Sequence, residues 1–176
     1  MVIINQLVKK AQKGDEKAYI ILFKKYEEDI YRMAYMYVRN QEDALDIVQE
    51  TAYKSFDQIK TLKQPEYFKS WLIRIAINTA INQLRKKKNI VHLRPDHIDI
   101  MCANEHDVPL QMTLKELIEG LNENEKSVLL LKFYADYTIN RISGILDMPI
   151  GTVKTILYRS LEKLRKQLNK EDIYEQ

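Results

Sequence analysis

The segment between residues 138 and 168 places the strongest constraint on the fold, because a short helical pattern, a tight turn and a longer helical pattern follow one another. In the longer pattern, apolar residues recur at intervals of four, four, three and four, at Val153, Leu157, Leu161, Leu164 and Leu168. At about 100° per residue these side chains fall on one stripe, which must be buried. Between residues 150 and 170, six Lys and Arg oppose one Glu. The pattern predicts a helix-turn-helix, whose second helix enters the major groove of DNA.

The turn supports this prediction. Pro149 cannot continue the preceding helix, and Thr152 can help to satisfy the free amides where the second helix starts. Opposite the apolar stripe lie Thr152, Thr155, Arg159, Glu162, Lys163 and Lys166, with Lys154 and Tyr158 on the flank. A solvated basic face on an ordinary surface helix is the alternative, but the preceding helix and tight turn favour the DNA-binding motif.

Composition limits the class of protein. The 176 residues suffice for one domain of usual size or two small ones, and 45% hydrophobic with 30% charged residues indicate a globular chain. Four Gly and four Pro favour helices over a turn-rich β fold. No apolar run reaches membrane-spanning length, the N-terminus lacks signal-peptide features, and one Cys excludes an intrachain disulfide, so we expect a cytoplasmic location.

Helical periods organise the N-terminal half. A short helix is expected over residues 3–12, ending near Gly14, and Asp15 is placed to cap the next. One apolar period from Tyr19 to Tyr37 predicts a continuous helix of five turns. Asn40 starts a third helix with an apolar inner face, Ala44, Ile47, Val48, Thr51, Ala52 and Phe56. Its outer face is acidic and polar: Glu42, Asp46, Gln49, Glu50, Tyr53 and Asp57.

A fourth helix is expected over about 66–87, with Pro65 suited to its start. It is apolar on most sides, which is typical of a helix buried in a bundle. One narrow polar stripe interrupts the apolar surface, formed by Arg74, Asn78, Asn82 and Arg85. The basic run at 85–88 ends the helix in solvent.

Residues 89–109 lose the helical period and contain Pro95 and Pro109, which predicts a flexible linker between domains at 1–88 and 110–176. In the second domain Leu114, Leu117, Ile118 and Leu121 mark one helix. Asn122 and Glu125 fit a reciprocal cap for the next. The predicted fold is all-α: two small helical domains, the C-terminal one containing the helix-turn-helix.

Three segments carry a resemblance to a known family. In chain order they are DALDIVQE at 43–50, FKSWLIRIAIN at 68–78 and PIGTVK at 149–154. Together they resemble the extracytoplasmic-function (ECF) group of bacterial RNA polymerase sigma factors. The resemblance covers roughly residues 15–168. It implies a factor that binds core RNA polymerase and recognises the −10 and −35 promoter elements. It also implies an anti-sigma protein as partner, which would hold the chain at the inner membrane face if it is itself membrane-bound, and no small-molecule substrate, cofactor or metal.

The resemblance also implies the site residues. It assigns polymerase docking to the acidic helix, at Asp43, Asp46, Gln49 and Glu50. An acidic stripe there would steer the protein towards a basic partner. Contacts with the −10 element fall to Tyr67, Phe68, Trp71, Arg74, Asn78, Asn82, Arg85 and Lys86. For Phe68 and Trp71, packing in the core is the alternative. Contacts with the −35 element fall to Lys154, Thr155, Tyr158 and Arg159, and Thr152 and Lys163 share the same helical face.

Some positions depart from the family pattern. Ile156 stands where many members have Arg, and Arg141 and Gly144 stand where acids are usual. Asp147 replaces a turn glycine, and Asp tolerates the left-handed conformation that this position would require. These changes bear on promoter preference more than on the fold.

Three other classes of function remain as alternatives. The chain has no glycine-rich phosphate loop, metalloprotease helix or nucleophile elbow, so no catalytic residues are expected. His92, His97, Cys102 and His106 are residue types that bind zinc, but their spacing fits no structural zinc site. A stand-alone regulator with the same motif would not need the acidic helix and the aromatic, basic segment at 60–88. The basic face at 150–170 argues against a partner-binding module without a DNA role.

Overall fold

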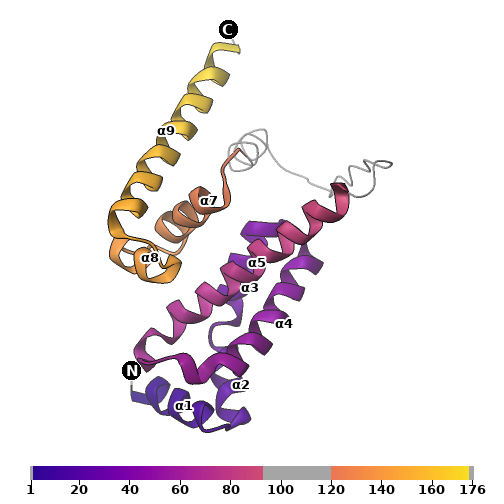
Figure 1. The fold of residues 1–176 in the computed structure, drawn as a ribbon, viewed down its shortest axis with the longest axis vertical. Coiled ribbons are helices and arrows are strands. Elements are labelled where there is room, and N and C mark those ends of the chain that lie inside the picture. The colour runs from indigo at the N-terminus through magenta and orange to yellow at the C-terminus, as the bar shows by residue number, and fades with distance from the viewer. Residues whose placement is uncertain (1, 93–119, 175–176) are drawn as a thin grey trace. The chain divides into compact units, whose positions relative to one another are not determined.

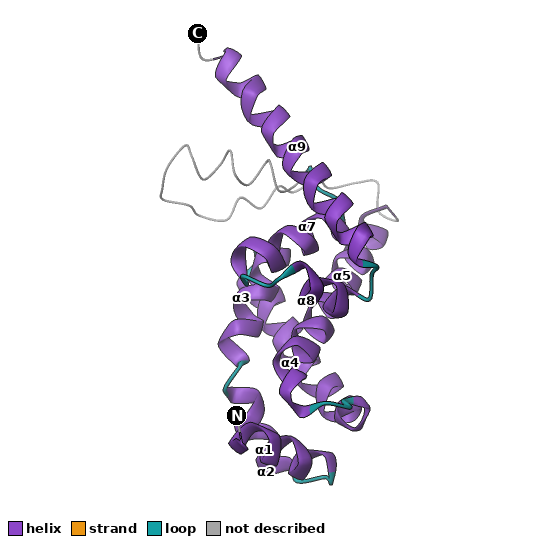
Figure 2. Cartoon of the chain, turned by 90° about the vertical axis from the view of Figure 1, so that its left-hand side faces the viewer, coloured by secondary structure: helices purple, strands orange, loops and turns teal. Residues whose placement is uncertain are grey.

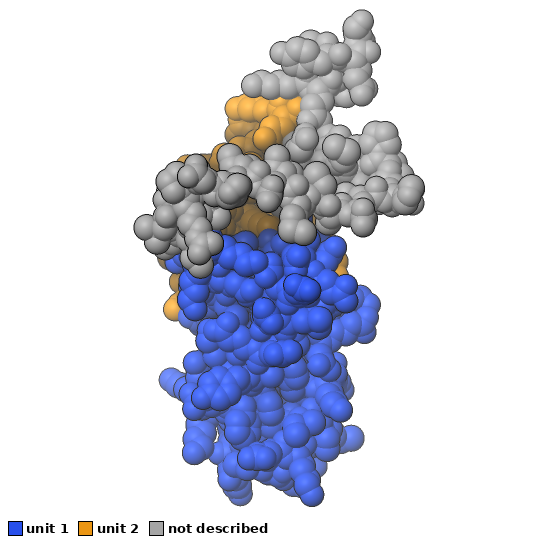
Figure 3. Space-filling model, turned by 90° about the vertical axis from the view of Figure 1, so that its right-hand side faces the viewer, with its two compact units in different colours: residues 1–95 blue, residues 96–176 orange. Residues whose placement is uncertain are grey.

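The computed structural model describes residues 2–92 and 120–174, and every regular element in these ranges is a helix (Figure 1, Figure 2). The chain divides into two compact units, Met1–Pro95 and Asp96–Gln176, which Figure 3 colours separately. The predicted all-α fold is therefore confirmed. No helix in the described ranges is long and apolar enough to cross a membrane.

The first unit is built from helices joined by short connections. In order these are α1 (Val2–Gln12), α2 (Glu16–Lys24), α3 (Glu27–Val38), α4 (Gln41–Gln58), the 3₁₀ turns η1 (Ile59–Thr61) and η2 (Pro65–Tyr67), and α5 (Phe68–His92). The predicted cap Asp15 and the predicted helix start Asn40 both bond to the first turn of their helices. The Asp15 carboxylate accepts the Ala18 N–H at 3.0 Å, and the Asn40 side chain accepts the Asp43 N–H at 3.0 Å. Each satisfies an amide that has no partner within its own helix.

The prediction of one continuous helix from Tyr19 to Tyr37 was wrong, because the chain breaks between α2 and α3. Tyr26 leaves the helical region, with φ −118° and ψ 1°, and its N–H bonds to the Phe23 carbonyl at 2.8 Å. The apolar period does not reveal this break, since Phe23 before it and Ile30 after it are both buried.

Helices α3, α4 and α5 pack against one another and form most of the core of the first unit (Figure 1). As predicted, much of α5 is buried in the bundle. Its core residues are Phe68, Leu72, Ile73, Ile75, Ala76, Ile77 and Ala80. Helices α1 and α2 pack as a pair. The Gln12 side chain ties α1 to the connection before α5, because its amide donates to the carbonyls of Ile59 at 3.1 Å and Leu62 at 2.8 Å.

The described part of the second unit contains α7 (Glu123–Leu129), a π-helical turn η3 (Leu130–Tyr134), α8 (Ile139–Leu146) and α9 (Ile150–Tyr174). The predicted reciprocal cap is present: Asn122 and Glu125 each accept the other's backbone N–H. Asp147 ends α8 in the left-handed conformation at φ 55°, as expected for a residue in the place of a turn glycine. The predicted helix-turn-helix is thus formed by α8 and α9.

Two details of α9 differ from the prediction. The helix begins at Ile150, so Thr152 lies within its first turn rather than before it. Of the apolar stripe, Val153 and Leu157 are buried, whereas Leu161 and Leu168 are 36% and 46% exposed. The described helices that pack on α9 are α7, of 7 residues, and α8, of 8, which are too short to cover 25 residues of α9.

Several predicted features lie outside the described residues. Of the expected linker at 89–109, only residues 89–92 are described, and they extend α5 beyond the predicted end at 87. The helix expected around Leu114–Ile118 falls in the range without description, as do His97, Cys102 and His106. Among the described residues, no group of three or more His, Cys, Asp and Glu side chains is arranged to hold a metal ion.

Candidate partner and nucleic-acid interfaces

The outer face of α4 is acidic and open to solvent. All six side chains predicted to point outwards are exposed: Glu42, Asp46, Gln49, Glu50, Tyr53 and Asp57. Tyr53, the one aromatic residue among these six, is 77% exposed. Glu50 also bonds to Lys54 one turn later, at 2.6 Å, which partly offsets its charge. The face therefore presents carboxylates and an amide around one exposed aromatic ring, a chemistry that suits a basic partner.

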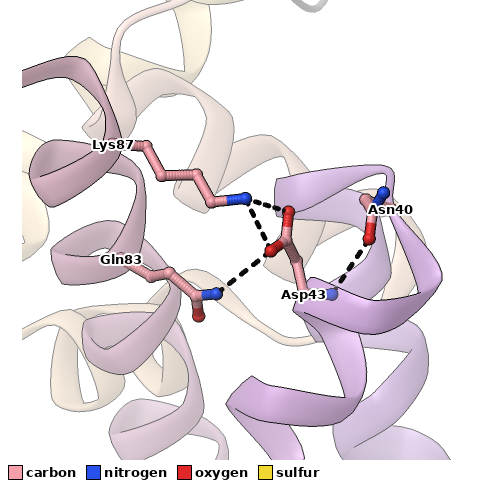
Figure 4. A network of polar contacts seen from close by, with 4 residues as sticks. All are labelled: Asn40, Asp43, Gln83 and Lys87. Carbon is pink, nitrogen blue, oxygen red and sulfur yellow. Dashed lines mark hydrogen bonds and ion pairs between the residues drawn. The ribbon is translucent and has the colours of Figure 1, made fainter. Parts of the chain in front are cut away.

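Asp43, which was also predicted to dock, lies apart from this exposed face. Both of its carboxylate oxygens lie 2.6 Å from the Lys87 ammonium, and one lies 3.4 Å from the Gln83 amide (Figure 4). Only 17% of the Asp43 side chain is exposed. The carboxylate thus connects the first turn of α4 to the C-terminal part of α5, because the helical position of Asp43 turns its side chain towards that neighbour.

A second polar contact joins the same two helices. Lys54, near the end of α4, lies 3.4 Å from the Thr79 hydroxyl of α5. The contacts at Asp43 and at Lys54 add to the packing of α4 against α5. The outward face of α4 and the polar stripe of α5 therefore lie on two helices that pack directly against each other.

The aromatic residues at the start of α5 have different environments. Tyr67 is 44% exposed, whereas Phe68 is 1% exposed and packs against the rings of Tyr26 and Trp71, each at a centroid distance of 5.8 Å. Phe68 is therefore a core residue and is removed from the candidate DNA contacts, since a buried ring offers no surface for base stacking. Trp71 is half-buried, and its ring lies against that of the buried Phe68.

The polar stripe of α5 is present as predicted. Asn78, Asn82, Arg85 and Lys86 are exposed and Arg74 is half-buried. On a different side of α5, Lys69 binds Asp29 at 2.6 Å and lies over the Tyr26 ring at 5.8 Å. Burial raises the pKa of Tyr26, which the Lys69 charge partly opposes and the Asp29 charge reinforces. The start of α5 thus combines exposed aromatic surface with cations and amides, the groups that bind unpaired bases and phosphates.

The second helix of the helix-turn-helix presents most of its predicted face to solvent. The exposed side chains are Thr152, Lys154, Thr155, Tyr158 and Arg159. Tyr158 is 65% exposed, and the Thr155 hydroxyl donates to the Gly151 carbonyl at 2.9 Å. Because Val153 and Leu157 are buried between these positions, the orientation of the face is set by the core. These side chains can reach base edges and phosphates as a recognition helix requires.

Lys163 has a different environment from the rest of this face. Its ammonium binds Glu125 of α7 at 2.6 Å, and the Glu125 side chain is only 2% exposed. Burial alone would raise the pKa of Glu125. The pKa is nevertheless lowered from its usual value, because Lys163 and the Asn122 N–H donate hydrogen bonds to the carboxylate and the charges of Lys163 and Arg159 stabilise it. Lys163 therefore has an intramolecular partner, which removes it from the group of freely presented cations.

The sequence did not reveal the partners of Asp43 and Lys163. Their partners lie 44 and 38 residues away in the chain, beyond the reach of any helical spacing rule. For Glu125 one signal was present, since the reciprocal cap with Asn122 uses only one of its two carboxylate oxygens. Its second oxygen then needs a partner from elsewhere.

Comparison with known proteins places both units in one family. A family model described as Sigma-70 region 2 matches residues 22–90, and one described as Sigma-70, region 4 matches residues 117–166. The chain is 38% identical to the RNA polymerase sigma factor SigV of Bacillus subtilis over 148 residues, covering 84% of this chain and 89% of SigV. It is 31% identical to the ECF RNA polymerase sigma factor SigW of the same organism, covering 94% of this chain and 96% of SigW. The chain belongs to the ECF family of RNA polymerase sigma factors.

A solved structure agrees with this sigma factor in fold. The structure of CnrH in complex with the cytosolic domain of CnrY matches with a TM-score of 0.70 at 16% identity, over 96% of this chain and 98% of CnrH. As a member of the family, this sigma factor binds core RNA polymerase and directs transcription initiation at promoters. Region 2 contains α4 and α5, and region 4 contains the helix-turn-helix.

Proposed function

We propose that this sigma factor uses three surfaces: the outer face of α4 for core polymerase, the polar side of α5 for the −10 element and the basic face of α9 for the −35 element. The observation that carries the proposal is that α9 has one exposed polar face and one buried apolar face. Lys154, Thr155, Tyr158 and Arg159 are exposed on the second helix of a helix-turn-helix, while Val153 and Leu157 fix its rotation in the core.

On α4 we assign docking to Asp46, Gln49 and Glu50. These side chains share the exposed acidic face, and their charge would attract a basic surface and fix the register of docking. Tyr53 extends the same face with an exposed ring, and aromatic side chains are enriched at protein interfaces. Asp43 is left out, because its carboxylate is bonded to Lys87.

On α5 we assign −10 recognition to Tyr67, the exposed part of Trp71, and the polar stripe Arg74, Asn78, Asn82, Arg85 and Lys86. Opened promoter DNA exposes unpaired bases, which stack on aromatic rings and bond to amides. On α9, Arg159 is the side chain best suited to bidentate contact with guanine, and Lys154, Thr152, Thr155 and Tyr158 surround it.

The proposal extends to the wider organisation of the protein. Two domains, 1–88 and 110–176, are joined by a linker into which α5 extends as far as His92. The protein works in the cytoplasm, has no catalytic activity of its own and is controlled by an anti-sigma partner. Family membership supports each of these statements.

Run-off transcription tests the proposal. Purified full-length protein is mixed with bacterial core polymerase and genomic fragments, and transcripts are mapped with and without the protein. We expect start sites that appear only in its presence, and their alignment gives both promoter elements. Tight binding to a duplex site without polymerase, together with no new start sites, would instead identify a stand-alone regulator.

A further inference from the structure

Glu125 connects the helix before the motif to the middle of α9. One carboxylate oxygen, Oε2, accepts the Asn122 N–H at 3.0 Å, and the other, Oε1, accepts the Lys163 ammonium at 2.6 Å. The Asn122 side chain accepts the Glu125 N–H at 2.9 Å in return. Each oxygen of this carboxylate thus has its own partner. Since the Glu125 side chain is only 2% exposed, solvent does not reach it.

The same anion faces part of the DNA-binding surface. Lys163 lies one helical turn after Arg159 on α9, and the charge of Arg159 also acts on the Glu125 carboxylate. The Lys163 side chain is 46% exposed, and its ammonium is bonded to the buried Glu125 carboxylate. One buried acid thus offsets part of the positive charge on this part of α9.

We infer that Glu125 is a positioning residue for −35 recognition: by binding Lys163 it withholds that cation from DNA phosphates, so that discrimination depends on Arg159 and the residues before it. This inference rests on the proposed role of α9. Phosphate contacts raise affinity for all sequences alike, whereas base contacts separate one sequence from another. A lysine that stays bonded to Glu125 adds little to the first kind of binding.

The next turn of α9 offers a matched comparison. Lys166 binds Glu162 at 2.7 Å, but these side chains are 71% and 65% exposed. An exposed ion pair contributes little and exchanges readily with solvent or phosphate. Removing the Glu162 charge therefore alters the formal charge of the protein as much as removing that of Glu125, without releasing a cation from a buried partner.

The test uses holoenzyme reconstituted from core polymerase and the full chain, bound to promoter DNA with an intact or a scrambled −35 element over a fourfold range of salt. Glu125→Gln keeps a side-chain oxygen for the Asn122 N–H but loses the charge that holds Lys163. We expect one additional phosphate contact, so affinity falls about 3-fold more over that salt range than in wild type. The ratio of affinities for intact and scrambled elements should fall as well.

Two controls separate this role from a purely structural one. Glu162→Gln should leave both the salt dependence and the affinity ratio unchanged. The double variant Glu125→Gln/Lys163→Gln should restore the wild-type salt dependence, because the released cation is then absent. Equal effects of Glu125→Gln and Glu162→Gln would overturn the inference and attribute the change to overall charge.

Lys163→Gln alone decides the question if Glu125→Gln folds poorly. Glutamine removes the charge but keeps an N–H donor at this position, and the inference expects wild-type salt dependence and discrimination. A salt dependence reduced by one phosphate contact would show that Lys163 already binds DNA, and the inference would be wrong. Failure of the wild-type holoenzyme to form, by contrast, would contradict the proposed function and not this inference.

Discussion

Asp43 and Asp46 lie three residues apart on α4 but have different surroundings. Asp46 is exposed, whereas Asp43 is bonded to Lys87 and Gln83 of α5 (Figure 4). The family resemblance grouped the two acids by sequence. The packing of α5 separates them, since only side chains on the far side of α4 remain available to a partner. At the residue scale, a motif thus includes positions that serve the fold as well as positions that serve binding.

Asp43→Asn should therefore reduce stability and leave polymerase binding intact. The Lys87 side chain is 54% exposed, so screening limits the contribution of this pair to about 0.5–1 kcal/mol. Urea unfolding measures the loss, which should shrink in high salt. Asp46→Asn is the matched control and should not change the free energy of unfolding. If the Asp43→Asn protein unfolded like wild type but bound polymerase tenfold more weakly, Asp43 would be a docking residue.

Glu125 should make the second unit sensitive to acid. Its pKa is lowered from the ordinary value of 4.5 in the folded protein, so the unfolded state takes up a proton first as pH falls. The stabilisation is complete above pH 4.5 and is lost as pH falls below 4.5 through the folded pKa. Unfolding measured by circular dichroism from pH 6 to pH 3 should show a smaller loss in Glu125→Gln than in wild type. Parallel curves for the two proteins would contradict this.

At the scale of elements, the sequence predicted helix starts well and helix breaks poorly. Asp15, Asn40 and Asn122 each lie at the helix start where they were expected, and each caps its helix, because capping depends on residues three positions apart. The break at Tyr26 has no such local signal, since apolar residues continue in phase on both sides.

The candidate surfaces follow the same rule. Exposure of the outer face of α4 and of the polar stripe of α5 was predictable, because helical spacing determines which residues share a face. The exposure of Leu161 and Leu168 was not, because it depends on the lengths of the helices that cover α9. Spacing determines a face, and tertiary packing determines how far along the helix that face is covered.

Gly144 gives an element-scale prediction. It lies exposed within α8, where an added Cβ would meet no atom within 4 Å. Gly144→Ala should therefore stabilise the protein by about 0.5–1 kcal/mol, because alanine loses less backbone freedom in a helix. Thermal or urea unfolding measures the gain. Gly14→Ala is the opposite control, since φ +93° at that position strains any other residue, and it should destabilise. A destabilised Gly144→Ala would show that the glycine has a further role.

At the scale of the whole molecule, the two units carry separate cores and separate candidate surfaces. The few contacts that each surface can make suggest weak binding alone. Linked units on a polymerase act as one reader, because the second contact becomes intramolecular once the first is made. Polymerase binding and promoter choice should therefore be separable by mutation.

Arg159→Ala should lose use of the −35 element by about 10- to 100-fold while still competing for core polymerase, since a good bidentate base contact contributes roughly 1–3 kcal/mol. Asp46→Lys with Glu50→Lys should do the reverse, because it presents positive charge to a basic partner. Competition binding to core polymerase and run-off transcription measure the two effects. If Arg159→Ala also failed to bind polymerase, the assignment of separate surfaces would be wrong.

The two sides of α5 differ in how freely they tolerate substitution. Ala76, Ile77 and Ala80 are packed on nearly all sides, whereas Asn78 and Asn82 project from the same turns into solvent. Exchanging either asparagine alters what the helix offers to a ligand without repacking the bundle. This part of the chain is consequently a natural starting point for directed evolution, in which new binding preferences are selected on an unchanged scaffold.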